Sequence, residues 1–209
     1  MSVLLKHEII DAINKNKITS YEQKINLQEI ESKIGVNSID VTLGCKLKTY
    51  IKCELNELFA NNEKCNVPII NDNLFTYIDI KAKNEVYELE IPEEGLILMP
   101  GVLYLGHTNE GLGSKYHIPM YEGRSSMARL GIQSHISAGF GDIGFDAQWT
   151  LEITVVHPVK IYPNTKIGQV FFMKIDEKES RKARELGNFY KGKYVNQKGV
   201  QESKSFLDF

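Results

Sequence analysis

Apolar and polar residues alternate over short segments through most of the chain, and this pattern predicts a mainly β protein. Glycine and proline separate the segments, notably at Pro92, Gly95, Pro100 and Gly101. Short strands at such close spacing favour a barrel or sandwich over alternating βαβ units. The strands are expected at residues 38–44, 75–80, 86–91, 96–99, 102–107, 150–156, 159–162 and 169–174.

Two segments have helical character instead. Residues 4–14 carry leucine and isoleucine at helix-like intervals, which predicts a short amphipathic helix near the N-terminus. Residues 125–130 predict a second short helix in the middle of the chain, capped by a serine hydroxyl and closed by Gly131.

Two other segments lack a periodic pattern. Residues 50–75 contain asparagine-rich turn formers and are expected to be irregular. Residues 176–209 hold eight Lys/Arg and six Asp/Glu with little apolar periodicity, which indicates a mobile basic tail. The simplest organisation is therefore one domain over residues 1–209, with 176–209 as its tail.

Composition narrows the function classes. The 209 residues are 42% hydrophobic and 25% charged, which is ordinary for a globular protein. A net charge of −2 gives no general attraction to nucleic acid or to an anionic membrane. The three cysteines have no CxxC spacing, the first eight residues lack the apolar core expected of a signal peptide, and no apolar run reaches membrane-spanning length. We therefore expect a reduced, cytoplasmic protein.

A basic, hydroxyl-rich segment in the middle of the chain is a candidate phosphate site. A serine at a helix start presents its hydroxyl and neighbouring N–H groups in one direction, where the helix dipole favours anions. Arginines at both ends add charged, fork-shaped donors. A capped surface helix with solvated arginines is the alternative. The segment reads Arg124-Ser125-Ser126-Met127-Ala128-Arg129.

A glycine-rich turn follows at residues 137–145 and holds one aspartate, Asp142. Glycine allows the backbone to approach a ligand closely, so the turn suits a sugar or a base. A tight hairpin needs the same residues, and this alternative stays open. Phe145 suits either the core or a place against a sugar ring.

One carboxylate interrupts an apolar strand. By strand alternation Glu152 shares a face with Thr150 and Thr154, so it lies either on a solvated face or in a cleft, where it could exchange protons with a substrate. The H-x-E and P-C-x-x-C signature of zinc deaminases is absent. His135 is interpreted as a packed structural residue rather than a ligand.

Taken in order, these motifs resemble those of the dCTP deaminase family in the dUTPase-like superfamily, and most closely its dUMP-forming members. Residues 123–131 match G-R-S-S-x-A-R-L-G almost fully. The resemblance covers most of the chain outside 50–75 and 176–190. Its other motifs are the S-[VI]-D-[LV]-x-L-G strand at 38–44, the segment at 94–101, the P-G-x-x-I-G-Q element at 161–169 and K-Y-x-x-Q at 193–197.

The resemblance implies a dUTPase-like fold, a distorted β-barrel or jelly roll of the β-clip type. It implies a homotrimer with active sites between subunits. It also implies hydrolytic deamination of dCTP without zinc, with Mg²⁺ accompanying the triphosphate.

The resemblance also assigns roles to individual residues. Glu152 matches the proton-shuttling glutamate, and Ser125 and Arg129 match residues that place the attacking water. The Ala138 carbonyl matches the group that holds this water, and Asp142 matches the partner of the deoxyribose 3′-hydroxyl.

Other matched residues surround the nucleotide. Arg124, Ser125 and Ser126 match the phosphate-binding turn, while Lys193 and Gln197 match tail residues that close over the triphosphate. The tail's aromatic contact is Tyr190 or Tyr194. The expected substrate-binding set is completed by Met127, Ala128, Phe145, Thr150 and Leu151.

The chain departs from the family at Gly141, Ala147 and Leu186, where isoleucine, glycine and tyrosine are usual. Gly139-Phe140 after Ala138 resembles members that carry dCTP through to dUMP and diphosphate, which favours this product over dUTP. Two alternatives remain: a dUTP diphosphatase that uses Asp142 to activate water, and a non-catalytic nucleotide-binding regulatory trimer.

Overall fold

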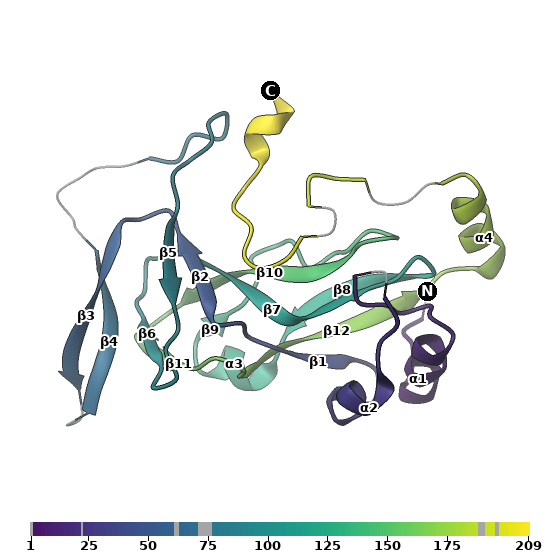
Figure 1. Ribbon diagram of the computed structural model, residues 1–209, viewed down its shortest axis with the longest axis horizontal. Helices are drawn as coiled ribbons and strands as arrows, with labels where there is room; N and C mark the ends of the chain where they lie inside the picture. The colour runs from purple at the N-terminus through teal and green to yellow at the C-terminus, as the bar shows by residue number, and fades with distance from the viewer. Residues whose placement is uncertain (1, 22, 61–62, 71–76, 188–190, 195–196) are drawn as a thin grey trace.

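The computed structural model describes residues 2–21, 23–60, 63–70, 77–187, 191–194 and 197–209. Within these residues the chain is mainly β, as predicted (Figure 1). The strands are β1 Ile39–Thr42, β2 Lys46–Thr49, β3 Cys53–Ala60, β4 Glu63–Ile70, β5 Tyr87–Glu90, β6 Leu96–Leu98, β7 Tyr104–Gly113, β8 His117–Gly123, β9 Ile132–Gln133, β10 Asp146–Val155, β11 Val159–Ile161 and β12 Lys166–Lys174. The helices are α1 Lys6–Asn14, α2 Leu27–Ile30, α3 Ser125–Arg129 and α4 Glu177–Glu185, with 3-10 turns η1 Glu31–Lys33 and η2 Ser205–Asp208.

The described strands are distributed over three sheets, in the orders β1-β12-β8, β5-β2-β7-β10-β9 and β11-β6-β4-β3. Hydrogen bonds between the strands that the structure describes do not close them into one continuous barrel. The long antiparallel pair β7–β10 lies at the centre of the five-stranded sheet, and its register shifts between Gln148 and Thr150. This pair forms the floor of the candidate site.

Strand β10 shows why the core and the site occupy opposite faces of this sheet. Leu151 and Ile153 are 0% and 1% exposed and pack in the core, whereas Thr150, Glu152 and Thr154 are only partly buried. Successive side chains of a strand point to opposite faces, so the apolar residues fix the direction of the polar ones. The predicted shared face of Glu152 and the two threonines is confirmed.

The N-terminal segment is held against this sheet by a buried carboxylate. Asp146 at the start of β10 accepts hydrogen bonds from the Thr19 hydroxyl (2.6 Å) and from the Tyr21 backbone N–H (2.8 Å). Helix α1, which follows the predicted apolar pattern, buries Ile9 and Ile13. No helix in the described part of the chain is long and apolar enough to cross a membrane.

Residues 50–75 were expected to be irregular, and this expectation is wrong for most of them. Strands β3 and β4 form a regular antiparallel hairpin from Cys53↔Ile70 to Ala60↔Glu63. A hairpin is defined by backbone pairing, and such pairing does not require the sequence to alternate. The expected strand at 75–80 is also absent from its described part, residues 77–80, where Asp79 and Asn84 close a loop. Residues 75 and 76 lie outside the described residues.

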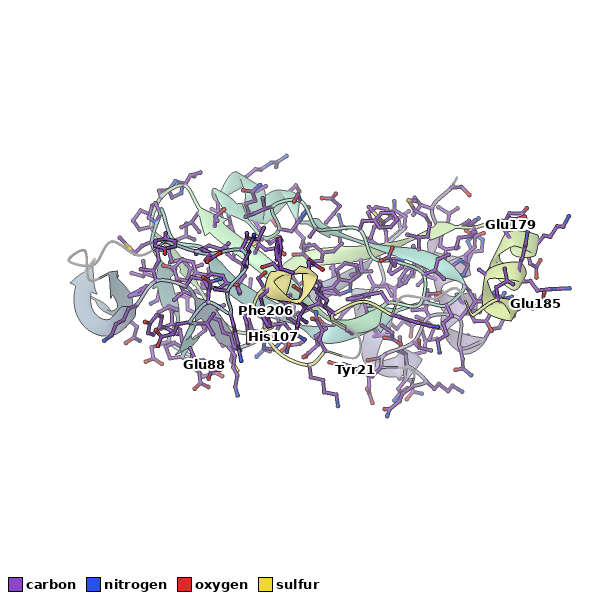
Figure 2. All side chains as sticks on the ribbon, turned by 90° about the horizontal axis from the view of Figure 1, so that it is seen from above. Tyr21, Glu88, His107, Glu179, Glu185 and Phe206 are labelled. Carbon is purple, nitrogen blue, oxygen red and sulfur yellow. The ribbon has the colours of Figure 1, made fainter. Side chains whose placement is uncertain are left out.

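The segment 176–209 contains a helix that its composition did not predict. Asp176 caps α4 by accepting hydrogen bonds from Lys178 N–H (3.0 Å) and Glu179 N–H (3.3 Å). Acidic residues in its first turn and basic residues in its last turn complement the helix dipole. Glu179 and Glu185 lie at one end of the molecule (Figure 2). The helix therefore begins on a cap and charge pattern without an apolar stripe.

A cavity of about 490 Å³ lies between α1, α4 and the start of β8, and His117 lies in its wall. Burial, with a smaller contribution from the nearby Lys17, lowers the pKa of His117 from its ordinary value of 6.5 to about 4, while Glu8 opposes this shift. The folded protein therefore holds this imidazole in its neutral form.

This arrangement predicts an acid-sensitive fold. Between pH 6.5 and about 4 the unfolded chain binds a proton at His117 that the folded chain does not, so stability is lost as the pH falls through this window. We expect the thermal midpoint of the wild type to fall more steeply across this window than that of His117→Gln. If the thermal midpoints of the two proteins fall equally with pH, His117 is not the source of the acid sensitivity.

Candidate active site

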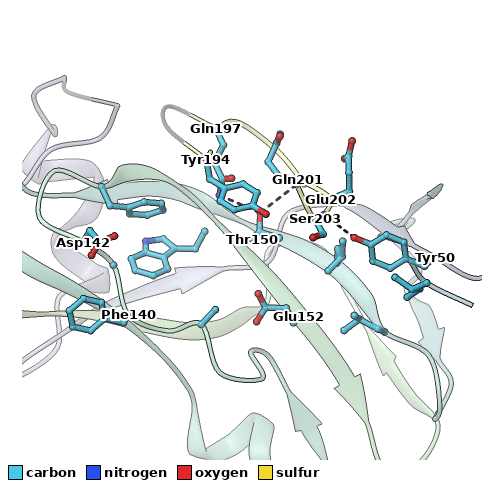
Figure 3. Close-up of a pocket in the computed structure, with 17 residues that line it drawn as sticks. Tyr50, Phe140, Asp142, Thr150, Glu152, Tyr194, Gln197, Gln201, Glu202 and Ser203 are labelled. Atoms are coloured by element: carbon cyan, nitrogen blue, oxygen red, sulfur yellow. Dashed lines mark hydrogen bonds between the residues drawn. The ribbon is translucent and has the colours of Figure 1, made fainter. Parts of the chain in front are cut away.

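A pocket of about 520 Å³ lies over the β7–β10 pair (Figure 3). The two strands form its floor, the glycine-rich turn forms one wall, and the C-terminal segment covers it. Polar groups in the wall include Asp142, Thr150, Glu152 and Gln197, and apolar groups include Phe140. A concave, largely apolar site with a few converging polar groups is typical of small-molecule binding.

Glu152 lies in the wall of this pocket, on the same face of β10 as Thr150 (Figure 3). Its Oε2 accepts a hydrogen bond of 3.2 Å from the Ile136 backbone N–H, in the loop that precedes the glycine turn. Of the two positions left open by the sequence, a solvated face or a cleft, the structure supports the cleft. One carboxylate oxygen is held by the backbone while the group borders the cavity.

The glycine-rich turn brings Ala138, Phe140 and Asp142 into the pocket wall. Gly141 is buried, and a Cβ there would lie 2.8 Å from the Trp149 ring and 2.9 Å from the Pro119 carbonyl oxygen. The turn is closed by a 3.0 Å hydrogen bond from Phe145 N–H to the Asp142 carbonyl. Close packing therefore explains Gly141, and the turn still presents Asp142 to the pocket.

Phe145 has a double contact. Its side chain lines the pocket and its ring packs against Trp149, with centroids 4.8 Å apart and an angle of 59° between the rings. Phe145 can therefore both pack against the core and contact a sugar ring, the two places that the sequence suggested for it.

The C-terminal segment crosses the pocket and binds β10 through its own polar groups. Gln197 Nε2 donates to the Gln148 carbonyl (2.9 Å) and to the Thr150 hydroxyl (3.3 Å). The Gly199 N–H donates to Gln148 Oε1 (2.6 Å). Gln197 is 8% exposed, and within the described residues its Oε1 has no hydrogen-bond partner.

Further anchors of this segment were missed by sequence reasoning. Ser203 N–H donates to the Tyr50 hydroxyl (2.8 Å), and Glu202 pairs with Lys48 of β2 (2.8 Å). Tyr50, Gln201, Glu202 and Ser203 all line the pocket. They belong to none of the recognised motifs, and only the three-dimensional fold brings residue 50 beside the end of the chain.

The segment 124–129 lies away from this pocket, although its residues were expected to bind the substrate. Arg124 pairs with Asp40 of β1 (2.9 Å), and Ser125 and Arg129 are exposed. In Figure 1, α3 lies at the lower edge of the molecule and the C-terminal segment at the upper edge. The other three residues of the segment do not line the pocket either: Ser126, Met127 and Ala128.

The predicted serine cap of α3 is wrong. Arg124 occupies the N-cap position without a side-chain hydrogen bond, so no serine hydroxyl caps the helix. The predicted end is confirmed: Gly131 has φ of +73°, and its N–H donates to the Ala128 carbonyl at 3.0 Å. At the other end of the helix, the Arg124 side chain does not cap the N–H groups of the first turn.

Of the other residues expected to contact the substrate, some line the pocket and some do not. Tyr194 lines the pocket, and its hydroxyl accepts a 3.0 Å hydrogen bond from Lys204 N–H. Lys193 pairs instead with Asp208 near the end of the chain. The Leu151 side chain is buried in the core and does not reach the pocket. Tyr190 lies outside the described residues.

His135 is packed as a structural histidine would be. Its ring meets Tyr121 edge to face at 5.5 Å, and Nε2 lies 3.3 Å from Glu122 Oε2. Among the described residues no group of three or more His, Cys, Asp or Glu side chains could hold a metal ion. The expectations of zinc-free chemistry and of phosphate-bound Mg²⁺ remain predictions.

With this geometry in view, comparison with known proteins defines the class. A family model described as dCTP deaminase-like matches residues 3–175, and the chain belongs to this family. A solved structure of 2′-deoxycytidine 5′-triphosphate deaminase from Agrobacterium tumefaciens shares the fold, with a TM-score of 0.54 and 16% sequence identity. The match covers 88% of this chain but only 53% of that one, so this chain spans about half its length.

Sequence relatives are more specific. The chain is 46% identical over 179 residues to a protein named dCTP deaminase, dUMP-forming, from Clostridium botulinum strain Alaska E43, covering 86% of each chain. It is 40% identical to a protein of the same name from Clostridium beijerinckii, covering 87% of this chain and 96% of that one.

Proposed function

We propose that this protein hydrolytically deaminates dCTP and carries the product on to dUMP. The names of its relatives support this activity. The observation that carries it is the position of Glu152 in the wall of a pocket that also contains Asp142 and Gln197. The reaction consumes two waters and releases ammonia, dUMP and diphosphate.

In the first step, Glu152 takes a proton from the water that attacks C4 of the cytosine. It then delivers protons to N3 and to the departing amino group, which leaves as ammonia. The backbone N–H of Ile136 holds one carboxylate oxygen at 3.2 Å and leaves the other free for this exchange. A positioned acid–base group of this kind typically accelerates a reaction by about 10²–10⁴-fold.

The sugar, the triphosphate and the attacking water have separate contacts in this proposal. Asp142 binds the deoxyribose 3′-hydroxyl, and Phe145 packs where a ribose 2′-hydroxyl would otherwise lie. Gln197, which β10 holds through the Gln148 carbonyl and the Thr150 hydroxyl, belongs to the tail that closes over the triphosphate in this proposal. The Ala138 carbonyl holds the attacking water.

The phosphates require a second copy of the chain. Ser125 and Arg129 do not line the pocket of their own chain, so we propose a homotrimer in which α3 of a neighbouring subunit completes each site. Exposed apolar residues close to α3, among them Leu130 (52%) and Val156 (74%), support burial of this surface against another subunit.

We further propose that Mg²⁺ is held by the phosphate oxygens of the nucleotide. Among the described residues no group of three or more His, Cys, Asp or Glu side chains could hold a metal ion, whereas a dedicated Mg²⁺ or Ca²⁺ cage needs several oxygen ligands together. Bound there, Mg²⁺ would neutralise charge on the phosphates.

Formation of dUMP requires a second water to attack the α-phosphorus, with diphosphate as the leaving group and Asp142 orienting the water. Gly139 gives no independent support for this step. A Cβ at this position would lie 2.5 Å from the Tyr121 carbonyl oxygen, so packing alone explains the glycine. Support comes from the names of the relatives and from Asp142 in the pocket wall.

A single product assay tests the proposal. With dCTP and Mg²⁺, we expect ammonia, dUMP and diphosphate to form in equal amounts, without accumulation of dUTP. Accumulation of dUTP without diphosphate would leave only the deamination step. Diphosphate release from dUTP without ammonia release from dCTP would identify a dUTP diphosphatase, and tight binding without turnover would identify a regulatory protein.

A further inference from the structure

A buried tyrosine lies directly behind the catalytic pocket. Tyr121 on β8 is 1% exposed, and its hydroxyl donates a 2.8 Å hydrogen bond to the Ser134 hydroxyl, which is itself buried. The ring stacks on Trp149 of the pocket wall, with centroids 6.0 Å apart and 29° between the planes. Burial raises the pKa of the phenol above its usual value, so it remains protonated and serves as a donor.

Tyr121 contacts both ends of the loop of residues 134–139, which runs into the glycine-rich turn. At one end its hydroxyl binds Ser134, and at the other its backbone N–H donates to the Gly139 carbonyl at 2.7 Å. The ring also fills the space beside Gly168, where a Cβ would come within 2.4 Å of ring atoms. The tyrosine is therefore fixed on the sheet side and can act as a rigid support for the loop.

The loop between these two contacts carries the groups that meet the reacting centre. Ile136 N–H holds Glu152 Oε2, and Ala138 lines the pocket. Ile136 and Ala138 are themselves exposed in the single chain, so their side chains give the loop little internal support. The position of the Ile136 N–H therefore depends on how the loop ends are held.

We propose that Tyr121 and Ser134 are positioning residues that, through their buried hydroxyl–hydroxyl hydrogen bond, fix the 134–139 loop and thereby orient Glu152. This inference rests on the proposed function, because it assigns Glu152 the proton transfers. Misplacement of a reacting group by about 1 Å from a distant mutation can cost about 10²-fold in rate. Loss of the tether should lower kcat much more than it changes KM.

The chain offers a matched control. Tyr104 of β7 is also fully buried, and its hydroxyl also holds a backbone segment, because it accepts a 3.0 Å hydrogen bond from the Met99 N–H. Its neighbours Leu103 and Leu105 line the pocket while Tyr104 itself does not. Tyr104→Phe therefore removes a comparable buried hydroxyl from a strand of another sheet.

The experiment compares Tyr121→Phe, Ser134→Ala, the double variant and Tyr104→Phe in the full-length protein. Steady-state ammonia release from dCTP gives kcat and KM, and amide hydrogen exchange reports on the loop without requiring turnover. For each tether variant we expect kcat to fall about 10- to 100-fold. Exchange should become faster in residues 134–139, and the double variant should resemble the single ones because both remove the same interaction.

The outcomes separate this inference from the proposed function. If the wild type releases ammonia but Tyr121→Phe keeps its kcat, or if Tyr104→Phe loses as much kcat, the tether is overturned. Additive losses in the double variant would also overturn it. If the wild type releases no ammonia, the proposed function fails, and unchanged exchange at residues 134–139 in the variants would then overturn the tether separately.

Discussion

Ammonia release from dCTP is expected to fall by about 10²–10⁴-fold in Glu152→Gln, while the nucleotide still binds. Glutamine keeps the size of the side chain and an oxygen that can accept from the Ile136 N–H. It cannot take a proton from water or return one to the leaving amine. Rate and affinity should therefore separate, which is the signature of a group that acts mainly in the transition state.

Two measurements check this result. Initial rates of ammonia release give the loss of turnover, and equilibrium titration with dCTP gives the affinity. Glu90→Gln is the matched control, because Glu90 is an exposed glutamate of β5 outside the pocket. Near-normal turnover in Glu152→Gln, or an equal loss in Glu90→Gln, would show that Glu152 is not the proton shuttle.

Mixing two inactive variants is expected to restore turnover. Glu152→Gln lacks the acid–base group and Arg129→Ala lacks a residue matched to placing the attacking water, and these residues lie on separate surfaces of one chain. If each site in a cyclic trimer combines Glu152 of one subunit with α3 of the next, every mixed trimer contains one intact site. Random assortment at equal amounts then gives about a quarter of the wild-type rate.

The test is to unfold and refold the two variants together and to measure ammonia release against each variant treated alone. A mixture of Glu152→Gln with Glu152→Ala is the control, since it can form no intact site and should stay inactive. Mixed trimers that remain inactive in the Glu152/Arg129 combination would place both groups in the site of one chain. Normal turnover of Arg129→Ala alone would show that Arg129 has no part in the site.

The parts of the fold that could be predicted are those in which local sequence and environment agree. The face of β10 that carries Glu152 follows from the buried Leu151 and Ile153 on the other side. The end of α3 follows from Gly131, whose φ of +73° is disfavoured for other residues. Such features depend on a few consecutive residues and so leave a pattern that can be recognised.

Other features depend on contacts that are distant in the sequence. Tyr50 meets Ser203, and Lys48 meets Glu202, only because the end of the chain returns over β2. Helix α4 depends on a cap and complementary charges, which carry no apolar periodicity. The separation of α3 from the pocket also could not be predicted from the motifs, because motifs that are close in the sequence can lie far apart in the folded chain.

The position of Trp149 gives this protein a natural optical probe. It is the only tryptophan of the chain, and its ring lies in the pocket wall between Tyr121 and Phe145. Its emission comes from one known place and is not mixed with that of other tryptophans. Occupancy of the pocket and movement of its glycine turn are therefore both open to intrinsic fluorescence, in the unlabelled protein and on the time scale of a single turnover.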